Sequence, residues 1–574
     1  MRLRWRGDPV GDVEDAAFPG ATRDTVDLPT PRVELFDSSP IGRRAVALNK
    51  IDNKLAEARA AFRAQCEEAG VRRVWEKFSG RIALVLAGGG ARGAYQAGAL
   101  AAFQDAGVPT HIIAAASIGS MNAAGYAAGS HTLVGNADPL VKYWARLTER
   151  DMGVEWTRWL WMLLGLLAAG AGFGNLLWYA AGLRGIRIHI QHPGLTWLAL
   201  GLAGIVVLFT CDKLPYLGYV IRNLLRGRPW QPDPRKAALS IAGNLIFWTA
   251  VAVVFHSMLA GVNLGALLAG YGLALAAGLM VLLLLVLLRK RWAPRLGFVV
   301  QRLLRITLHT GLFTNYERAR ILREAMTNQQ LSASPIRLVI TVADLESGRP
   351  RFFCNTPAAR LVHEPGADPS FVRREILATD DLIGAVVASS ALPIAFEPVR
   401  IAGRVCGDGG LCANEPIRPA VRLGADVVFL VMMSLPGMAH YRIDTFIDVG
   451  LCGLDILMQQ NLQQELGLLS TMNSVCEQAA ASLGLRPEEV EIVLGERRFR
   501  HVRCFAICPP QPLAGTTLHS DPRIAAPNML RGYLDAQAQI LNFLEDARVA
   551  RYVWPRRVLS WTPATEDKLE AAGD

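Results

Sequence analysis

The chain has 574 residues, of which 51% are hydrophobic and only 19% are charged, and its formal net charge is +10. A chain this apolar buries a large core, which excludes extensive disorder, and since many of its basic residues flank long apolar runs, anionic lipid rather than nucleic acid is the expected partner. The nine cysteines form no C-x-x-C pair, so neither a disulfide framework nor a zinc site is indicated.

The first 80 residues are predicted to form an N-terminal extension. Residues 1–40 are rich in Pro, Gly and Asp and contain no secretory signal, and we assign them no function. From Leu48 onward, apolar residues recur every three or four positions, as in an amphipathic helix: Ile51, Leu55, Ala58, Phe62 and Cys66. We expect this helix to pack on the domain that follows rather than to bind a separate partner.

Two strand–turn–helix units come next. Residues 81–93 read RIALVLAGGGARG, an apolar run of strand length that ends in three glycines and leads into a helical segment. In the second unit, the run HIIAAA leads into Ser117 and a helix of small residues. This alternation predicts an α/β fold with parallel strands. Further strand candidates lie at residues 335–345, 424–433 and 503–508.

A long apolar region separates these units from the later strands. Four transmembrane helices are predicted, at residues 159–183, 193–211, 237–259 and 264–288, with a turn at residues 261–263. Basic residues cluster before the first span, between the second and third, and after the fourth, so both ends of the region should face the cytoplasm. The region is thus predicted to be an insertion in a soluble fold, and the Ala- and Arg-rich composition is compatible with a bacterial inner membrane.

Ser117 is a candidate nucleophile. It lies in Ala115-Ala116-Ser117-Ile118-Gly119, between a strand candidate and a helix candidate, where a nucleophile elbow places its serine on a sharp turn. The usual pattern is G-x-S-x-G, and Ala115 replaces the first glycine. Taken alone, such a serine is more often the N-cap of a helix.

The glycine-rich loop Gly88–Gly93 is a candidate oxyanion hole. A loop with so few side chains can turn its backbone N–H groups toward the oxyanion of a tetrahedral intermediate, and the N–H of Ile118 is a further candidate donor. Arg92 is expected either to brace the loop or to meet a lipid phosphate, although a solvated arginine is an equally good interpretation.

The same glycines match two nucleotide-binding patterns in part. The dinucleotide fingerprint G-x-G-x-x-G requires an acidic residue about 20 positions further on, where this chain has the sequence HIIA at residues 111–114. The Walker pattern requires Gly-Lys-Ser/Thr after the glycines, which the chain lacks. Neither pattern is therefore favoured.

Asp408 is the candidate base. It lies in Cys406-Gly407-Asp408-Gly409-Gly410, after the strand-like run VRIAGRV, and a serine nucleophile needs a base within hydrogen-bond reach. An Asp-Gly-Gly sequence alone usually marks only a turn. A Ser/His/Asp triad is the competing mechanism, and its candidate histidines are His440, His501 and His519, none of which stands in a recognisable motif.

Together with the sequence SSALP at residues 389–393, these three motifs resemble the patatin-like phospholipase family in identity and order. In that family a GGGxR/KG loop supplies the oxyanion hole, the serine of GxSxG attacks the ester, and the aspartate of DGG or DGA acts as base. The resemblance covers residues 81 to about 150 and about 330 to 435. It implies that Ser117 is the nucleophile, that Asp408 is the base, and that the oxyanion loop consists of Gly88, Gly89, Gly90, Arg92 and Gly93.

The expected fold is thus a patatin-like three-layer α/β/α hydrolase domain interrupted by a four-helix transmembrane insertion. The predicted organisation is an N-terminal extension (1–80), the first half of the catalytic domain (81–150), the insertion (157–288), the second half (297–550) and a C-terminal tail (551–574). The implied function is a serine-dependent lipid acyl hydrolase, of phospholipase A or lysophospholipase type, at the cytoplasmic face of a membrane, with a phospholipid or other lipid ester as substrate. This hydrolytic mechanism requires no metal or cofactor.

Two other functions are weighed against this one. A catalytically silent membrane scaffold would not need to retain Ser117 and Asp408. A transporter would need polar groups in its spans, in which His256 is the one ionisable residue. The sequence does not indicate an oligomeric state.

Overall fold

The computed structural model describes residues 41–147, 157–180, 193–210, 214, 234–259, 313, 315–434, 446–515, 517, 521–549 and 557–561. The chain divides into two compact units. The first, here called the sheet unit, comprises Met1–Met152, Arg318–Leu392 and Val399–Asp574, and the second, the insertion unit, comprises Gly153–Glu317 and Pro393–Pro398. Each is described by itself.

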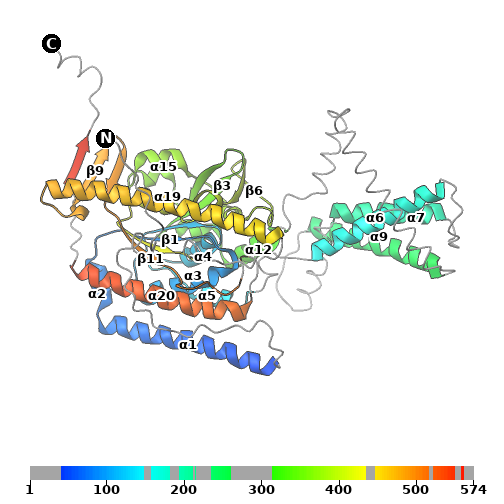
Figure 1. Ribbon diagram of the computed structural model, residues 1–574, viewed down its shortest axis with the longest axis horizontal. Coiled ribbons are helices and arrows are strands. Elements are labelled where there is room, and N and C mark those ends of the chain that lie inside the picture. The colour runs from blue at the N-terminus through cyan, green and yellow to red at the C-terminus, as the bar shows by residue number, and fades with distance from the viewer. Residues whose placement is uncertain are drawn as a thin grey trace, which may run out of the picture. The chain divides into compact units, whose positions relative to one another are not determined.

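The sheet unit contains a mixed, mostly parallel sheet, which has nine strands among the described residues (Figure 1). The strands are β1 (Ile82–Leu86), β2 (Ile112–Ala116), β3 (Arg337–Asp344), β4 (Arg349–Cys354), β5 (Ile376–Leu377), β6 (Val399–Ile401), β7 (Arg404–Asp408), β8 (Val427–Val431) and β11 (Arg503–Ile507). Their order is β11-β8-β1-β2-β3-β4-β5, and β7 pairs with both β3 and β6. The five strands predicted from apolar runs, β1, β2, β3, β8 and β11, are confirmed and run parallel to one another.

Not every strand follows the prediction. The run VRIAGRV is not one strand but the hairpin β6–β7, in which Ala402 and Gly403 form the turn with positive φ angles of 48° and 79°. Because β4 and β7 run antiparallel to β3, the sheet is not purely parallel. The predicted α/β class is therefore confirmed, with a mixed sheet.

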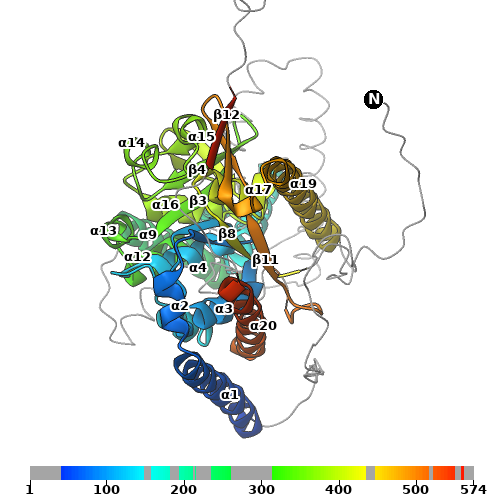
Figure 2. The ribbon, with the colours of Figure 1, turned by 90° about the vertical axis from the view of Figure 1, so that its left-hand side faces the viewer.

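Helices lie on both faces of the sheet, which gives the three layers seen in Figures 1 and 2. On one face lie α3 (Ala94–Asp105) and α20 (Pro522–Val549), and on the other lie α18 (Ile417–Arg422) and α19 (Phe446–Ser482). The other helices with part or all of their length in this unit are α1 (Ile41–Glu68), α2 (Val71–Lys77), η1 (Gly90–Gly93), α4 (Ile118–Ala127), α5 (Asp138–Trp144), α12 (Tyr316–Ala325), α13 (Asn328–Ala333), α14 (Ala358–Leu361), α15 (Pro369–Glu375), α16 (Leu382–Ser389), α17 (Gly410–Ala413) and η2 (Pro487–Glu489).

The central strands are apolar throughout because both of their faces are covered. Every residue of β1, β2 and β8 is buried. Val85 and Val428 belong to a core cluster that includes residues of α18 and α19. On the opposite face, Phe429 packs against Phe103 of α3 and Phe543 of α20, with ring centroids 5.0 and 5.5 Å away.

The amphipathic helix of the N-terminal extension packs on the sheet unit, as predicted. Leu55 and Phe62 of α1 are buried, and Phe62 meets the ring of Tyr533 on α20 edge-on. Arg59 forms two hydrogen bonds of 2.8 Å with Asp105 at the end of α3. The helix begins at Ile41, earlier than the apolar periodicity indicated.

A second, smaller sheet corrects the prediction of a C-terminal tail. It consists of β10 (Arg497–Arg500), β9 (Val490–Leu494) and β12 (Arg557–Trp561) among the described residues. β12 pairs in parallel with β9 along its whole length. Part of the segment 551–574 therefore belongs to the folded structure, because it completes a sheet whose other strands lie about 60 residues earlier in the chain.

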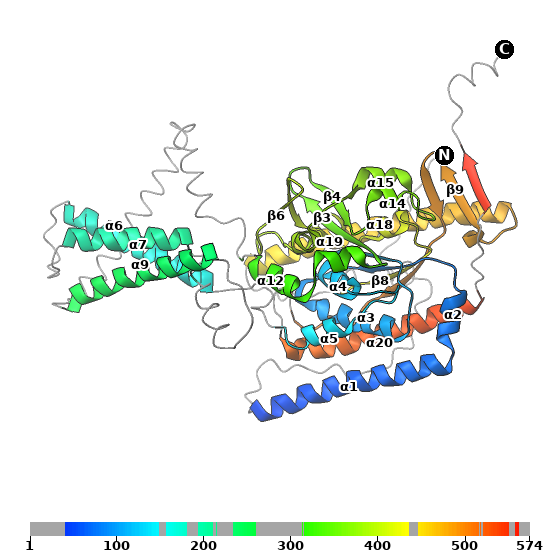
Figure 3. The same cartoon turned by 180° about the vertical axis from the view of Figure 1, so that it is seen from behind.

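The insertion unit contains α6 (Thr157–Ala180), α7 (Pro193–Thr210) and α9 (Pro234–Leu259), which correspond to the first three predicted spans (Figure 3). Within the described part of the chain, one of these helices is long and apolar enough to cross a membrane, over Leu160–Leu177. The apolar stretches of the other two, Trp197–Leu208 and Ser240–Ala252, are shorter. The fourth predicted span and the turn before it lie outside the described residues. The four-helix insertion therefore stays a prediction.

Small residues let α6 and α7 pack closely. A Cβ atom on Gly172 would come within 2.2 Å of the backbone nitrogen of Gly201, and one on Gly204 within 2.2 Å of that of Ala169. Such close approach of helix backbones is typical of helix pairs in membranes. Many large apolar side chains of these helices are exposed, among them Leu163 at 53% and Leu177 at 63%.

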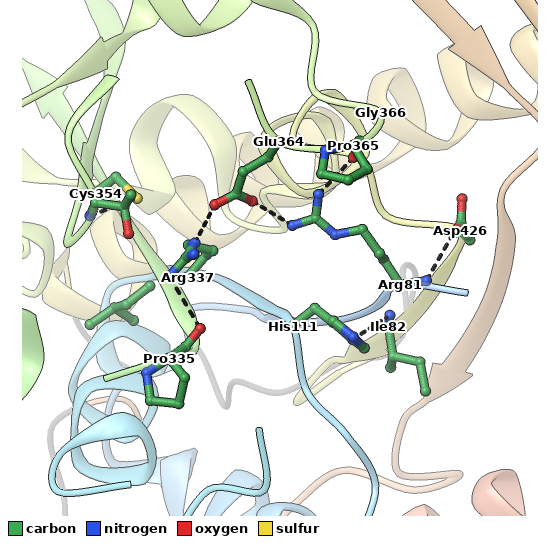
Figure 4. Close-up of polar contacts among 12 residues, drawn as sticks. Arg81, Ile82, His111, Pro335, Arg337, Cys354, Glu364, Pro365, Gly366 and Asp426 are labelled. Carbon is green, nitrogen blue, oxygen red and sulfur yellow. Dashed lines mark hydrogen bonds and ion pairs between the residues drawn. The ribbon is translucent and has the colours of Figure 1, made fainter. Parts of the chain in front are cut away.

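A charged network joins the amino-terminal ends of the central strands (Figure 4). Glu364 accepts hydrogen bonds from Arg81, just before β1, at 2.7 Å and from Arg337, the first residue of β3, at 2.5 Å. The backbone amide of Arg81 donates to Asp426, just before β8, at 2.8 Å. The amide of Ile82 donates to His111, whose pKa burial lowers to about 4, so that its ring is a neutral acceptor.

Replacing Glu364 by glutamine is expected to lower the free energy of unfolding by about 1–3 kcal/mol, because two arginines lose their carboxylate partner. Urea unfolding monitored by circular dichroism measures the change. Glu496→Gln is the matched control: its ion pair with Arg373 has side chains 57% and 60% exposed, and its loss should cost about 0.5 kcal/mol or less. Equal losses in the two variants would show that the network does not stabilise the sheet.

Candidate active site

The candidate catalytic residues meet because β3 pairs with both of the strands that precede them. Ala116, the last residue of β2, pairs with Thr341 of β3, and the chain continues directly into Ser117. Asp408, the last residue of β7, pairs antiparallel with Val342, the next residue of β3. β2 and β7 therefore end at adjacent positions of one strand. This register brings together two side chains that are 291 residues apart in the sequence.

Ser117 lies on a strained turn between β2 and α4. Its φ of 52° and ψ of −130° are rare for residues other than glycine. Its amide donates to the hydroxyl of Ser389 at 3.0 Å. Gly119 lies against β1, where a Cβ atom would come within 2.4 Å of the carbonyl oxygen of Leu86. This is the geometry of a nucleophile elbow, and it forms with Ala115 at the position of the first glycine.

The side chain of Ser117 contacts Asp408 directly. Ser117 is the N-cap residue of α4, but its hydroxyl makes no capping bond and instead donates to Asp408 Oδ2 at 2.7 Å. The amide of Gly410 donates to Asp408 Oδ1 at 2.8 Å. Asp408 is fully buried and Ser117 is 9% exposed. In this arrangement a proton can pass from the serine to the aspartate without an intervening histidine.

Burial dominates the protonation of Asp408. It raises the pKa of the carboxyl group to about 6, while hydrogen bonds from Ser117 and Gly410 and the charge of Arg318 act in the opposite direction. Such a carboxylate is more basic than an exposed aspartate and is still ionised at neutral pH. Asp408 is therefore suited to accept the proton of Ser117.

The amides of the glycine loop differ in what they can bind. The amide of Gly88 donates to the carbonyl oxygen of Asn414 at 3.2 Å and is not open to a ligand. Among the described residues, the amides of Gly89 and Gly90 have no acceptor, and neither has the amide of Ile118 in the first turn of α4. These three are the candidate oxyanion donors that the structure leaves open.

Arg92 and Gly93 support the glycine loop. Arg92 is 4% exposed and its Nε donates to the carbonyl oxygen of Gly89 at 3.2 Å, so it braces the loop, one of the roles predicted for it. Gly93 packs η1 against α4, since a Cβ atom there would lie 2.6 Å from Ile118 Cγ1 and 2.9 Å from Trp144 Cζ2.

The sequence interpretation missed Asn414, which joins the glycine loop to the Asp-Gly-Gly turn. Its backbone carbonyl accepts the amide of Gly88, and its side chain is 7% exposed. Cβ atoms on Gly88 and Gly410 would come within 2.4 and 2.7 Å of Asn414 Oδ1. A larger residue at either position would have to displace the buried side-chain amide of Asn414. The only sequence signal was an asparagine soon after the Asp-Gly-Gly motif.

Residues 389–391 link the nucleophile to the candidate base. The hydroxyl of Ser389 accepts the amide of Ser117 and donates to the carbonyl oxygen of Thr341 at 2.6 Å. The carbonyl oxygen of Ala391 accepts the amide of Asp408 at 3.0 Å. The motif containing these residues contributed to the family resemblance, but its bridging role is visible only in the structure.

The described histidines give no triad. His501 Nε2 lies 3.3 Å from Glu477 and Nδ1 lies 3.8 Å from Glu488, so it belongs to a different ionic group. His440 and His519 lie outside the described residues. Within the described part of the chain, no group of three or more His, Cys, Asp and Glu side chains is placed to hold a metal ion.

Comparison with known proteins identifies one family. The family described as "Patatin-like phospholipase" matches residues 84–204 and 253–421. Among solved structures, the crystal structure of VipD from Legionella pneumophila matches with a TM-score of 0.29 and 15% sequence identity, over 82% of this chain and 67% of that chain. No match was found among curated proteins.

Proposed function

The chain belongs to the patatin-like phospholipase family, a family of carboxylic ester hydrolases that act on lipid acyl esters, and on this premise we propose that it hydrolyses phospholipids or lysophospholipids with Ser117 as nucleophile and Asp408 as base. The observation that carries the proposal is the buried hydrogen bond of 2.7 Å between Ser117 Oγ and Asp408 Oδ2. A buried serine–carboxylate pair beside a strained turn is the arrangement that activates a hydroxyl for acyl transfer.

The first half of the reaction forms an acyl-enzyme. Ser117 Oγ attacks the carbonyl carbon of the ester while its proton passes to Asp408 Oδ2. The carbonyl oxygen becomes an oxyanion, which the amides of Gly89, Gly90 and Ile118 are proposed to stabilise. When the intermediate collapses, the bond to the alcohol oxygen breaks, and the alcohol leaves with the proton from Asp408.

Water completes the reaction. A water molecule attacks the carbonyl carbon of the acyl-enzyme and gives one proton to Asp408. The second tetrahedral intermediate collapses, the acyl–Ser117 bond breaks, and the serine oxygen recovers that proton from Asp408. The products are a fatty acid and the alcohol part of the lipid, and the enzyme returns to its starting state.

Covalent labelling separates this function from its rivals. A fluorophosphonate probe is expected to label Ser117, identified by mass spectrometry of the labelled peptide, and prior labelling should abolish hydrolysis of a fluorogenic phospholipid. A silent scaffold or a transporter would show neither effect. Ser120→Ala, which changes a buried serine in the first turn of α4, the helix that begins directly after Ser117, is the control that should still be labelled.

The pH dependence of kcat/KM is expected to report the ionisation of Asp408. Only the carboxylate can accept the serine proton, so kcat/KM should fall about tenfold per pH unit below about 6 and level off above that value. Stopped-flow assays between pH 4.5 and 8 with a neutral substrate measure the profile. A rate that stays constant down to pH 4.5 would contradict a basic role for Asp408.

We further propose that residues 157–288 anchor the enzyme in a membrane with its catalytic domain on the cytoplasmic face. The apolar Leu160–Leu177 segment, the exposed leucines of α6 and the basic residues around the predicted spans support this topology. Cysteines introduced at positions 187 and 228 test it with a membrane-impermeant maleimide in intact cells. Only position 187 should react before lysis, and the reverse result would overturn the topology.

A further inference from the structure

Arg318 is a buried cation in a segment whose sequence predicts a surface position. It lies in the first turn of α12, in the charged sequence YERARILREA, yet it is only 2% exposed. Other arginines of the same helix lie nearer the surface, and the side chain of Arg323 is 60% exposed. An arginine is rarely this deeply buried unless its guanidinium is paired.

The contacts of Arg318 lead to the segment between the two candidate catalytic residues. Its Nη1 donates to the carbonyl oxygen of Ser390 and, at 3.1 Å, to the hydroxyl of Ser390. The neighbours of Ser390 on either side hold the amides of Ser117 and Asp408. Arg318 therefore fixes the middle residue of a three-residue bridge whose two ends position both members of the pair.

The charge of Arg318 also acts on Asp408. Its positive charge opposes the effect of burial and favours the ionised carboxylate, while the pKa of Arg318 itself is lowered by burial to about 9, so that it is charged at neutral pH. Asp408 and Tyr143 of α5 oppose this lowering of the pKa of Arg318.

Other charges near β7 belong to a separate group. Asp344 of β3 pairs with Arg351 of β4 and Arg404 of β7. Burial and the charge of Asp344 raise the pKa of Cys406, while the two arginines lower it. Among the described groups, Arg318 is the residue whose charge shifts the pKa of Asp408, and the shift is downward.

We propose that Arg318 is a positioning residue for ester hydrolysis, holding residues 389–391 in place and maintaining Asp408 as a carboxylate. This inference rests on the proposed function. Since Arg318 is buried and does not reach solvent, it acts through Ser390 and Asp408 rather than on the lipid. Its loss should therefore change kcat and the pH profile and leave KM nearly unaltered.

Arg318→Met removes the charge and keeps the length of the side chain. We expect kcat to fall at least about tenfold at pH 8, and the acidic limb of the kcat/KM profile to move upward by about one pH unit, because an uncompensated buried carboxyl is harder to ionise. Arg318→Lys keeps the charge and loses the guanidinium contacts, so kcat should fall while the limb stays in place. Arg323→Met is the matched control on the same helix and should behave like the wild type.

The outcomes separate the inference from the proposed function. If the wild type neither hydrolyses lipid esters nor is labelled at Ser117, the proposed function fails. If the wild type is active and Arg318→Met has a wild-type acidic limb and kcat, the inference alone is overturned. Should Arg318→Met not fold, Arg318→Lys and Ser390→Ala decide: both should lower kcat at least about threefold with unchanged KM, and wild-type kcat in both would refute the inference.

Discussion

Ser117→Ala and Asp408→Asn are each expected to lower kcat/KM for a phospholipid substrate by at least about ten-thousandfold. Without the hydroxyl there is no nucleophile, and an asparagine cannot accept the proton that leaves Ser117 Oγ across the 2.7 Å hydrogen bond. The two effects should not add, because the side chains act in one step. The double variant is therefore expected to match the single variants.

Histidine variants provide the contrast. His501 pairs with Glu477 and Glu488, so His501→Ala should retain hydrolysis within about threefold of the wild type. His440→Ala and His519→Ala test the two remaining triad candidates and should also stay active. An inactive histidine variant would contradict catalysis by the Ser/Asp pair. An Asp408→Asn variant with more than a tenth of wild-type activity would contradict it as well.

Stability measurements show whether the loss of activity in Asp408→Asn reflects unfolding or the missing base. In the native state burial raises the pKa of Asp408 to about 6, above the value of 3.8 for a free aspartate. The native state therefore binds the proton more tightly, and this stabilisation is full below about pH 4 and is lost as pH rises through 6. At pH 8 the wild type carries the cost of a buried carboxylate, which asparagine removes. Asp408→Asn should unfold at an equal or higher temperature than the wild type at pH 8.

Gly119→Ala is expected to lower kcat/KM by at least about a hundredfold. A Cβ atom there would lie 2.4 Å from the carbonyl oxygen of Leu86 and 2.8 Å from that of Ala87, and neither backbone group can move without shifting β1 or the glycine loop. The start of α4 must then move away from β1, which displaces Ser117 and the amide of Ile118 together. Thermal unfolding should show a loss of about 1–3 kcal/mol.

Ala115→Gly is the matched variant at the other glycine position of the motif. Ala115 is fully buried in β2 and the elbow already forms with its methyl group in place, so restoring glycine should change kcat/KM by less than about threefold. The loss of a strand side chain should cost about 1 kcal/mol of stability. The account of the elbow would be wrong if Gly119→Ala stayed fully active, or if Ala115→Gly were more than tenfold faster.

Much of this site could be predicted from short stretches of sequence. The runs that became β1, β2, β3, β8 and β11 are apolar along their whole length because both sheet faces are covered, and such runs are visible without a structure. Ser117 and Asp408 could be found for a related reason: an elbow and a tight turn need small neighbours, and these neighbours are adjacent in the sequence.

The sequence by itself thus determined the α/β class and indicated the glycine loop, Ser117 and Asp408 as candidate site residues, because each depends on residues that are near one another in the chain. Only the tertiary structure decided which groups meet. The register of β3 places Asp408 beside Ser117. The amide of Gly88 donates to the carbonyl oxygen of Asn414, and Arg318 is buried although its own helix is charged. The physical reason is that pairing register and burial are set by partners far away in sequence, which no local pattern encodes.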